Sequence, residues 1–388
     1  MNEFLLVHKS QRTFWKSIRF TQNFLMYFVV VLIALVGCGE RTSGPKIWYV
    51  WRNVSSAEIR VLDPISNQQR VIVRSERGED ILGADLSPDG QYIAYGINAS
   101  KGGTSIWLVD ARGSSPKQIT QGAESVWSSW LDRNSLIVSS GDWIPGPTLP
   151  PLDFYIYDIS MRRIMPVVVS GSQRDLFRCA MNKFSDHPER VALSDNSRPA
   201  LGHLELKDGT IKIVTDLTID LSEFPELIDA DCLSWTPDGK RIVLQGTTVL
   251  LKREDLFLAS NQGRAVVRLT DFGKDFEQAT FSTYAISPDG QWVVAIASLN
   301  PRPVFGFPYA ATLVLVKTDT KKVTFMGLPD ILGPDRLVWS PDSRYVAITA
   351  PKVFDRMSDN QIYVIDIEKK EIRQLTNDSG QKEVFDWR

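Results

Sequence analysis

A short turn sequence recurs along the chain, and it limits the possible folds more than any other feature. The turn reads Ser-Pro-Asp-Gly or a close variant, and an apolar, strand-like run follows each copy. Clear copies begin at Ser87, Thr236, Ser287 and Ser340, and degenerate copies begin at Leu131 and Ser185. The spacing is about 50 residues, which is typical of a unit that repeats around a β-propeller.

The rest of each repeat supplies two further strands. Residues 106–110 form the third strand of one copy, and residues 118–120 end its fourth. A unit of four short strands is a propeller blade. Such a unit cannot cover its own apolar faces, so neighbouring blades must stack to bury them. The sequence therefore predicts an all-β chain.

The two ends of the repeat region complete each other. Residues 47–50, 58–61 and 70–73 match the second, third and fourth strands of a blade, and no first strand precedes them. Residues 384–388 match a first strand, so we expect the C-terminal strand to close the propeller and remove its open edge. This shared blade and six internal copies predict a seven-bladed β-propeller. The copy around 177–215 is the weakest, which leaves six blades as the alternative.

These repeats resemble the WD40-like Pro-Asp repeats (PD40) of the TolB-type propellers. The same repeat type occurs in the propeller domains of prolyl oligopeptidase relatives. The resemblance covers nearly all of the chain after its N-terminal segment, and it implies the fold. It implies little about function, because this fold hosts scaffolds, binding proteins and enzymes. A peptidase interpretation has little support, since the sequence lacks a G-x-S-x-G nucleophile elbow.

The N-terminus has the features of an export signal. Four basic residues precede an apolar run at 24–36, which is short for a membrane span of about 20 residues. The run ends in Leu35-Val36-Gly37-Cys38, which resembles the bacterial lipobox. We therefore expect a signal peptide at 1–37, a palmitate-type lipid on Cys38, a linker at 38–45 and the propeller at 46–388. An uncleaved N-terminal anchor is the alternative.

This N-terminus predicts a cell-envelope protein that is lipid-anchored to a membrane and faces the periplasm or the cell exterior. The formal net charge is −2, and it becomes −5 once residues 1–37 are removed. A mildly acidic chain without a basic block is a poor candidate for nucleic-acid binding. We expect a monomer.

Metal and catalytic chemistry find little support, so the sequence predicts no cofactor, no metal site and no catalytic residues. After signal removal only His187 and His203 remain, and no C-x-x-C, H-E-x-x-H or P-loop motif is present. Acidic residues gather at 216–231, where a solvated loop is favoured and calcium binding stays open. We expect Cys179 and Cys232 to be free thiols.

The recurrent residues have structural interpretations. Asp89 and its equivalents are expected to bond nearby backbone amides within their turns. Trp130, Trp235, Trp339 and Trp387 occupy one repeat position, where Leu86, Phe184 and Ile286 also occur. The exchange of tryptophan for other apolar residues indicates packing between blades.

Insertions gather in the connections between second and third strands, which share one face of the predicted propeller. Aromatic and arginine side chains on proline-stiffened loops make good binding anchors. We expect a partner-binding face that contains Trp143, Arg302, Phe305, Phe307, Tyr309 and Phe354. The alternative is that these loops pack on one another or plug the channel. The predicted function is a membrane-tethered scaffold that binds an envelope protein or a glycan ligand. The alternative is a glycan-directed enzyme with its active site at the propeller channel.

Overall fold

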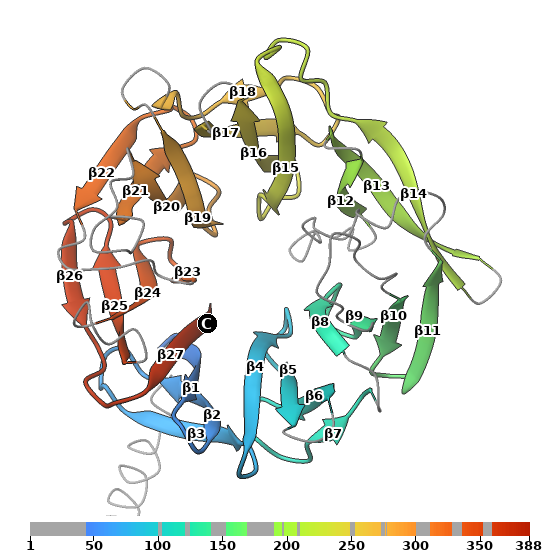
Figure 1. Ribbon diagram of the computed structural model, residues 1–388, viewed down its shortest axis with the longest axis vertical. Coiled ribbons are helices and arrows are strands. Elements are labelled where there is room, and N and C mark those ends of the chain that lie inside the picture. Colours follow the sequence, from blue (N-terminus) through green and yellow to red (C-terminus); the bar gives the residue numbers. More distant parts are fainter. Residues whose placement is uncertain are drawn as a thin grey trace, which may run out of the picture. The chain divides into compact units, whose positions relative to one another are not determined.

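The structure is a computed structural model, and its contacts divide the chain into residues 1–44 and 45–388. It describes residues 44–99, 103–120, 125–140, 153–168, 190–195, 198–207, 210–248, 253–272, 276, 278–299, 311–327, 336–351 and 359–388. The elements of secondary structure in these residues are the strands β1 to β27, so the chain is all-β (Figure 1). In the same residues, no helix is long and apolar enough to cross a membrane.

Consecutive strands pair antiparallel into meanders. The first meander is β1 (Ile47–Arg52), β2 (Ala57–Leu62) and β3 (Gln69–Arg74), joined by β27 (Gln381–Trp387). The second meander is β4 (Glu79–Leu86), β5 (Tyr92–Ala99), β6 (Gly103–Asp110) and β7 (Lys117–Gln118). The third is β8 (Ser125–Trp130), β9 (Ser135–Ser140), β10 (Asp153–Asp158) and β11 (Arg163–Val168). The fourth is β12 (Arg190–Asp195), β13 (Arg198–Lys207) and β14 (Thr210–Thr218). The fifth meander is β15 (Leu227–Trp235), β16 (Arg241–Thr248), β17 (Arg253–Ser260) and β18 (Val267–Arg268). The sixth is β19 (Ala279–Ile286), β20 (Trp292–Leu299), β21 (Ala311–Lys317) and β22 (Val323–Gly327). The seventh is β23 (Leu337–Trp339), β24 (Tyr345–Pro351), β25 (Asn360–Asp366) and β26 (Glu371–Gln374).

The recurrent turn is held by its serine and aspartate side chains. Ser87 Oγ donates to Asp89 Oδ1 over 2.7 Å and accepts from the Tyr92 backbone N–H over 2.9 Å. Gly90 has a φ of 71°, in the left-handed region that glycine adopts without a Cβ penalty. The copies at Thr236, Ser287 and Ser340 repeat these side-chain bonds. Asp89 Oδ1 also accepts from the Gln91 backbone N–H over 3.1 Å, and the other three aspartates accept in the same way. The predicted structural role of the turn aspartates is confirmed, and the serine or threonine is an equal part of the turn.

The last copy of the turn has Ser343 where the others have glycine. Ser343 has a φ of 59°, and its Oγ accepts the backbone N–H of Asp289, in the preceding meander's turn, over 3.0 Å. Ser343→Ala keeps the strained φ and loses the bond, so it should lower the free energy of unfolding by about 1 kcal/mol. Ser343→Gly loses the same bond but relieves about 1–2 kcal/mol of strain, so it should be near neutral. Denaturant titration of both variants checks this, and equal losses would contradict it.

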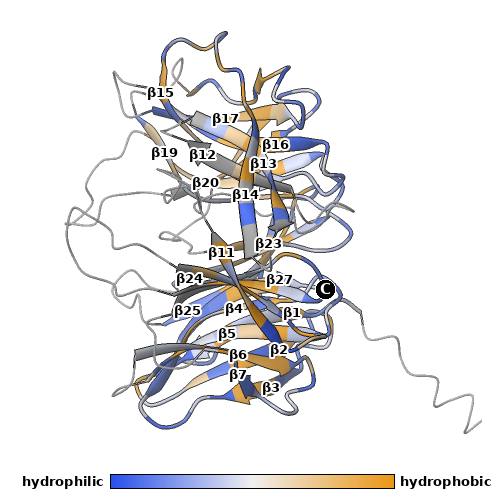
Figure 2. Cartoon of the chain, turned by 90° about the vertical axis from the view of Figure 1, so that its right-hand side faces the viewer, coloured by the Kyte–Doolittle hydropathy of each residue, from blue (hydrophilic) through white to orange (hydrophobic). Residues whose placement is uncertain are grey.

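Apolar clusters lie between consecutive meanders. Trp130 packs with Ala94 and Leu108 of the preceding meander, and Trp339 packs with Val294 and Leu313. The indole N–H groups of Trp130 and Trp339 donate to the carbonyls of Asp85 and Ala285, which lie in β4 and β19. The predicted packing role of these tryptophans between neighbouring repeats is confirmed. Apolar residues follow the strands in Figure 2, and many of the turns are hydrophilic.

The C-terminal strand β27 pairs with β1, the strand that begins the described unit. β27 lies antiparallel to β1, with Ile47 opposite Trp387 and Arg52 opposite Gln381 (Figure 1). One core cluster therefore combines Val384 and Trp387 with residues of β1, β2, β24 and β25. The predicted first-strand role of the C-terminus is confirmed, because no residue of β27 pairs with its sequence neighbours in β26.

Candidate functional site

The residues that the sequence assigned to lipidation and partner binding lie outside the described residues. These are Cys38, Trp143, Arg302, Phe305, Phe307, Tyr309 and Phe354, and Cys179 is also outside. The strands that flank three of these segments are described. Segments 141–152, 300–310 and 352–358 join β9 to β10, β20 to β21 and β24 to β25, as the repeats predicted. Their roles stay predictions.

The first strands of several meanders line a common hollow. Two adjoining cavities of about 420 and 780 Å³ share six lining residues. The shared residues, which define what we call the inner hollow, are Thr283, Tyr284, Arg336, Leu337, Val338 and Phe385. The smaller cavity adds the polar residues Asp85, Thr104, Ser128 and Ser129. The two cavities therefore combine hydroxyl groups with charged side chains: Asp85 lines the smaller cavity, the ion pair of Asp386 and Arg388 lines the larger one, and Arg336 lines both.

Two arginines share the carboxylate of Glu383 beside this hollow. Arg336 Nε lies 2.8 Å from Glu383 Oε1, and Arg52 Nη2 lies 3.0 Å from Glu383 Oε2. Arg52 also donates to the carbonyl of Ile81 and lies 3.2 Å from Asp80 Oδ1. Arg336 is 46% exposed, whereas Glu383 is 16% exposed. Glu383 thus orients a guanidinium whose remaining N–H donors can meet an acceptor in the hollow.

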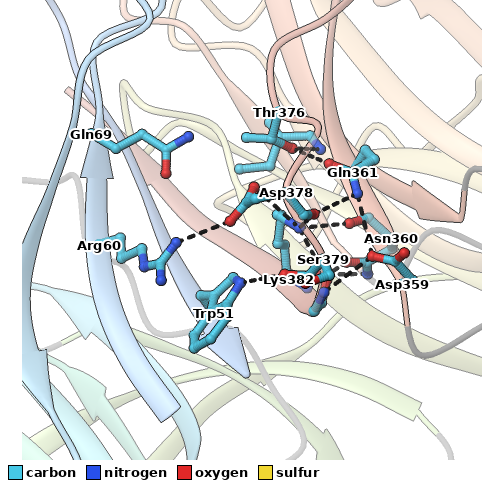
Figure 3. Close-up of polar contacts among 12 residues, drawn as sticks. Trp51, Arg60, Gln69, Asp359, Asn360, Gln361, Thr376, Asp378, Ser379 and Lys382 are labelled. Carbon is cyan, nitrogen blue, oxygen red and sulfur yellow. Dashed lines mark hydrogen bonds and ion pairs between the residues drawn. The ribbon is translucent and has the colours of Figure 1, made fainter. Parts of the chain in front are cut away.

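A buried lysine of β27 binds β25 and the loop before β27, next to the cluster of Arg52, Arg336 and Glu383. The side chain of Lys382 is fully buried, and its Nζ donates to the carbonyls of Asn360, Asp378 and Gly380 over 3.0, 2.7 and 3.0 Å (Figure 3). These three bonds satisfy all three donors of an ammonium group. Burial lowers the pKa of Lys382, and the carboxylates of Asp378 and Asp359 oppose that shift.

Side chains of β1 and β2 bind the same loop from the other side. Arg60 lies between Glu58 and Asp378, at 2.7 and 3.1 Å, and its guanidinium stacks 4.1 Å above the Trp51 ring. The Trp51 indole N–H donates to the carbonyl of Ser379 over 2.8 Å (Figure 3). These contacts and those of Lys382 form what we call the closing joint, which ties β25, β27 and β1 together.

The phenol of Tyr49 is also buried behind the closing joint. Its hydroxyl donates to Gln69 Oε1 over 2.7 Å. Burial raises the pKa of Tyr49 to about 12, so the phenol stays neutral at physiological pH. The closing joint therefore has a structural role, because its charged side chains pair with one another and the Tyr49 hydroxyl donates a hydrogen bond within the protein.

Three carboxylates of the acidic segment 216–231 contact groups within the protein, whereas Asp229 Oδ1 is buried without a hydrogen-bond partner among the described residues. Asp216 Oδ1 lies 2.8 Å from His203 Nδ1, and Asp220 Oδ1 accepts from the Ser222 N–H over 3.0 Å. Glu226 contacts Arg268. Among the described residues, no group of three or more His, Cys, Asp or Glu side chains could hold a metal ion.

Sequence reasoning missed Arg336, Glu383 and Lys382. One signal for Lys382 was present, because it alternates with Val384 on the buried side of β27. No signal marked Arg336, which precedes a strand of three residues and belongs to no repeated motif.

Comparison with known proteins supports the fold. No protein-family model matches the sequence, and no curated protein matches it. TolB from Acinetobacter baumannii is similar in structure, with a TM-score of 0.50 and 17% identity, over 92% of this chain and 69% of that chain. A prolyl endopeptidase has a TM-score of 0.60 and 12% identity over 89% of this chain, which spans 49% of that enzyme. An oligogalacturonate lyase in complex with manganese has a TM-score of 0.52 and 11% identity, with 85% and 84% covered.

At these identities the likeness shows the fold alone. The neighbours are TolB-type propellers and propeller-containing enzymes, so the chain has the architecture of a β-propeller protein. The same architecture carries binding proteins and enzymes, so function has to come from this chain's own residues.

Proposed function

We propose that this chain is a membrane-tethered, extracytoplasmic β-propeller that acts as a scaffold for an envelope protein or a glycan ligand. The single observation that carries the proposal is the inner hollow, where Glu383 holds the Arg336 guanidinium among hydroxyl groups. Donors fixed in this way favour recognition of a polar ligand, because little entropy is lost when the ligand binds. We further propose that the partner contacts the segments that carry Trp143, Arg302 and Phe354, as the sequence predicts.

The scaffold is a closed propeller of seven blades. The pairing of β27 with β1 and the closing joint support closure. The antiparallel set of β12, β13 and β14, which meets the preceding meander only through a short parallel pairing of β14 with β11, supports seven blades over six, since it accounts for the weakest repeat. A closed ring of blades supplies a rigid base that positions the loops joined to it, which is what a binding scaffold requires.

The tether is a lipid on Cys38, after removal of residues 1–37. The segment from Cys38 to Lys46 extends at most about 28 Å, so the propeller works close to the bilayer. The cell envelope, facing the periplasm or the exterior, is therefore the site of action. Cys38→Ser is the control for lipid attachment, because it removes the thiol that receives the lipid and leaves the propeller sequence intact.

Partner capture from the native envelope tests the scaffold function. A photo-reactive residue placed at Phe305 or Tyr309 should cross-link one defined partner, and Arg336→Ala should weaken that cross-link about tenfold without lowering the melting temperature. Lys321→Ala, in a turn between third and fourth strands, is the matched surface control and should leave capture unchanged. Cys38→Ser should release the protein from membranes and abolish palmitate labelling. Capture that survives Arg336→Ala but fails in Lys321→Ala would contradict the assignment.

A glycan-directed enzyme with its site at the channel is the second candidate. The observation that favours it is the hollow itself, since Asp85, Tyr284 and Arg336 line it together. If the protein turns over an acidic oligosaccharide, and both Tyr284→Phe and Arg336→Ala abolish this activity, the enzyme assignment would replace the scaffold assignment.

A further inference from the structure

The turns between third and fourth strands lie beside the Ser-Pro-Asp-Gly turns, at one end of the meanders. In the second meander, the Ala111 backbone N–H donates to the carbonyl of Gln91 over 2.8 Å, and four other meanders repeat this bond between the two kinds of turn. Turns of neighbouring meanders also meet, since Ser343 Oγ accepts from the Asp289 N–H over 3.0 Å. We call the surface formed by both kinds of turn the turn face.

The chain enters the propeller on the turn face. Lys46 comes just before β1, and its Nζ lies 2.5 Å from Asp63 Oδ2, in the turn between β2 and β3. Arg388, which exchanges backbone hydrogen bonds with Lys46, donates to the carbonyls of Ser87 and Pro88 in the first of the Ser-Pro-Asp-Gly turns. The segment that precedes Lys46 therefore leaves from the turn face.

The length of this segment favours the turn face as the side nearest the membrane, a step that rests on the lipid tether proposed above. From Cys38 to Lys46 the tether extends at most about 28 Å. Strand β5 has eight residues, so the two ends of a meander are about 26 Å apart. A tether that had to reach past the opposite face would be used up almost completely.

Exposed basic side chains gather in the turns between third and fourth strands. Seven are described there, and all are exposed: Arg112, Arg162, Arg264, Lys321, Lys322, Lys369 and Lys370. The described turns of this kind hold three acidic residues, Asp63, Asp319 and Glu368, so four positive charges are in excess.

The other charges of the turn face cancel. Five acidic residues of the described Ser-Pro-Asp-Gly turns and their degenerate copy are matched by five basic residues there and beside the chain entry: Asp89, Asp132, Asp238, Asp289 and Asp342 against Lys46, Arg133, Lys240, Arg344 and Arg388. The turn face is therefore positive, although the formal charge of residues 38–388 is −5. Such a separation of charge favours an anionic surface as the partner of this face.

Two apolar side chains are exposed on the same face. Ile65, in the turn after β2, is 82% exposed, and Met161, in the turn after β10, is 71% exposed. Their backbones are fixed, because the N–H groups of Ile65 and Met161 donate to the carboxylates of Asp63 and Asp158 over 2.9 Å. Apolar groups among basic ones suit the boundary between lipid headgroups and acyl chains.

We propose that the turn face docks on a bilayer surface that is rich in anionic lipid headgroups. An anionic leaflet attracts basic side chains that come within about one Debye length, roughly 10 Å at 0.1 M salt. Ile65 and Met161 then enter the headgroup region, where their apolar surface leaves water. The lipid on Cys38 keeps the protein near the bilayer, and the turn face sets its orientation.

Docking in this orientation leaves the other end of the meanders for a partner. The segments that carry Trp143, Arg302 and Phe354 join second and third strands, so the strands that flank them end on that side. Lys321→Ala removes one basic residue of the turn face and leaves the tether in place, so it remains a control for partner capture at the other end.

The test uses full-length protein isolated from membranes and reconstituted into phosphatidylcholine vesicles, with or without about 30% phosphatidylglycerol. An environment-sensitive fluorescent amino acid replaces Ile65, Met161 or Val54, which is fully exposed in the connection between β1 and β2. The probes at Ile65 and Met161 should emit at shorter wavelength only with phosphatidylglycerol. This shift should disappear at about 1 M salt, where the Debye length is about 3 Å. The probe at Val54 should not shift in either kind of vesicle.

Two double variants, each without two positive charges, compare the two faces. Lys369→Gln with Lys370→Gln should lower the ratio of docked to free protein about thirtyfold, read from the probe at Met161 at the salt concentration where the wild type is half docked. Arg74→Gln with Arg77→Gln is the matched control, because both arginines are exposed, at the end of β3 and just after it, on the opposite side from the turn face. The control should leave the ratio unchanged.

The outcomes separate docking from the tether. Probes at Ile65 and Met161 that do not shift, in protein that floats with neutral vesicles, would overturn the docking and leave the tether standing. Protein that does not float with neutral vesicles would contradict the tether, and flotation with anionic vesicles alone would then support the docking, while its absence would overturn it. Equal shifts in both kinds of vesicle would overturn the role of charge. A shift at Val54, or equal losses in the two double variants, would place the contact elsewhere on the protein.

Discussion

Deletion of residues 381–388 is expected to prevent folding of the whole described unit. The deleted strand contributes Val384, Phe385 and Trp387 to two core clusters. Each large apolar side chain contributes about 1.5–3 kcal/mol on burial, so the deletion removes about 5–9 kcal/mol. That loss is similar to the entire stability of an ordinary domain. The deletion also exposes the edge of β1, which favours aggregation.

Far-UV circular dichroism and limited proteolysis of the truncated chain measure this effect. Arg388→Ala is the matched control, because it removes only the side-chain bonds to the carbonyls of Ser87 and Pro88 and an ion pair with Asp386. The control should remain folded. A truncated chain with a wild-type melting temperature would show that β27 is dispensable.

Lys382→Ala is expected to lower the free energy of unfolding by about 3–5 kcal/mol. The substitution leaves one buried and two part-buried carbonyls without their donor, and it removes one of the two cations beside Asp378, the other being Arg60. Lys382→Met fills most of the same volume, so it should lower the free energy of unfolding by less than Lys382→Ala does. The difference between the two variants separates the effect of the cavity from the effect of the lost hydrogen bonds. Exposed Lys321→Ala is the control and should stay within about 0.5 kcal/mol of the wild type. Denaturant titration measures all three, and a loss below about 1 kcal/mol for Lys382→Ala would contradict the role of the closing joint.

The pH dependence of the same variants gives an independent check. Burial lowers the pKa of Lys382 in the folded protein below the usual lysine value of 10.5. Between the lowered pKa and 10.5, the unfolded chain binds more protons than the folded chain, so stability rises with pH. The wild type should therefore gain stability relative to Lys382→Met as the pH rises through that window. A difference that falls with pH would mean that the ammonium form is favoured by folding.

Much of the fold could be predicted from the sequence because each repeat carries local chemistry. The Ser-Pro-Asp-Gly turns use bonds within five residues of one another, such as Ser87 to Tyr92. The threonines that end the fourth strands also have a fixed partner, since Thr120 and Thr376 each accept the third-strand N–H of Ile106 or Ile362 over 2.9 Å. Local rules of this kind leave a periodic trace in the sequence.

The candidate site could not be predicted in the same way, because its contacts join residues that are far apart in the chain. Arg52 and Glu383 meet only once β27 pairs with β1, and Arg336 comes from a different meander. The predicted anchors Trp143, Arg302, Phe305, Phe307, Tyr309 and Phe354 lie on insertions, where no repeat constrains the conformation. The acidic segment 216–231 was left open, since its partners His203 and Arg268 come from β13 and β18.

A disulfide between the two ends of the repeat region tests most directly the claim that the C-terminal strand closes a propeller. The backbone of Lys46 exchanges two hydrogen bonds with that of Arg388, which places the two Cα atoms within disulfide range. Under mild oxidation, the variant with Lys46→Cys and Arg388→Cys should form this bond, identified by mass spectrometry of the unreduced digest. The pair Lys46→Cys and Lys321→Cys should not. Failure of the first pair to cross-link, or equal cross-linking of both, would contradict a closed propeller.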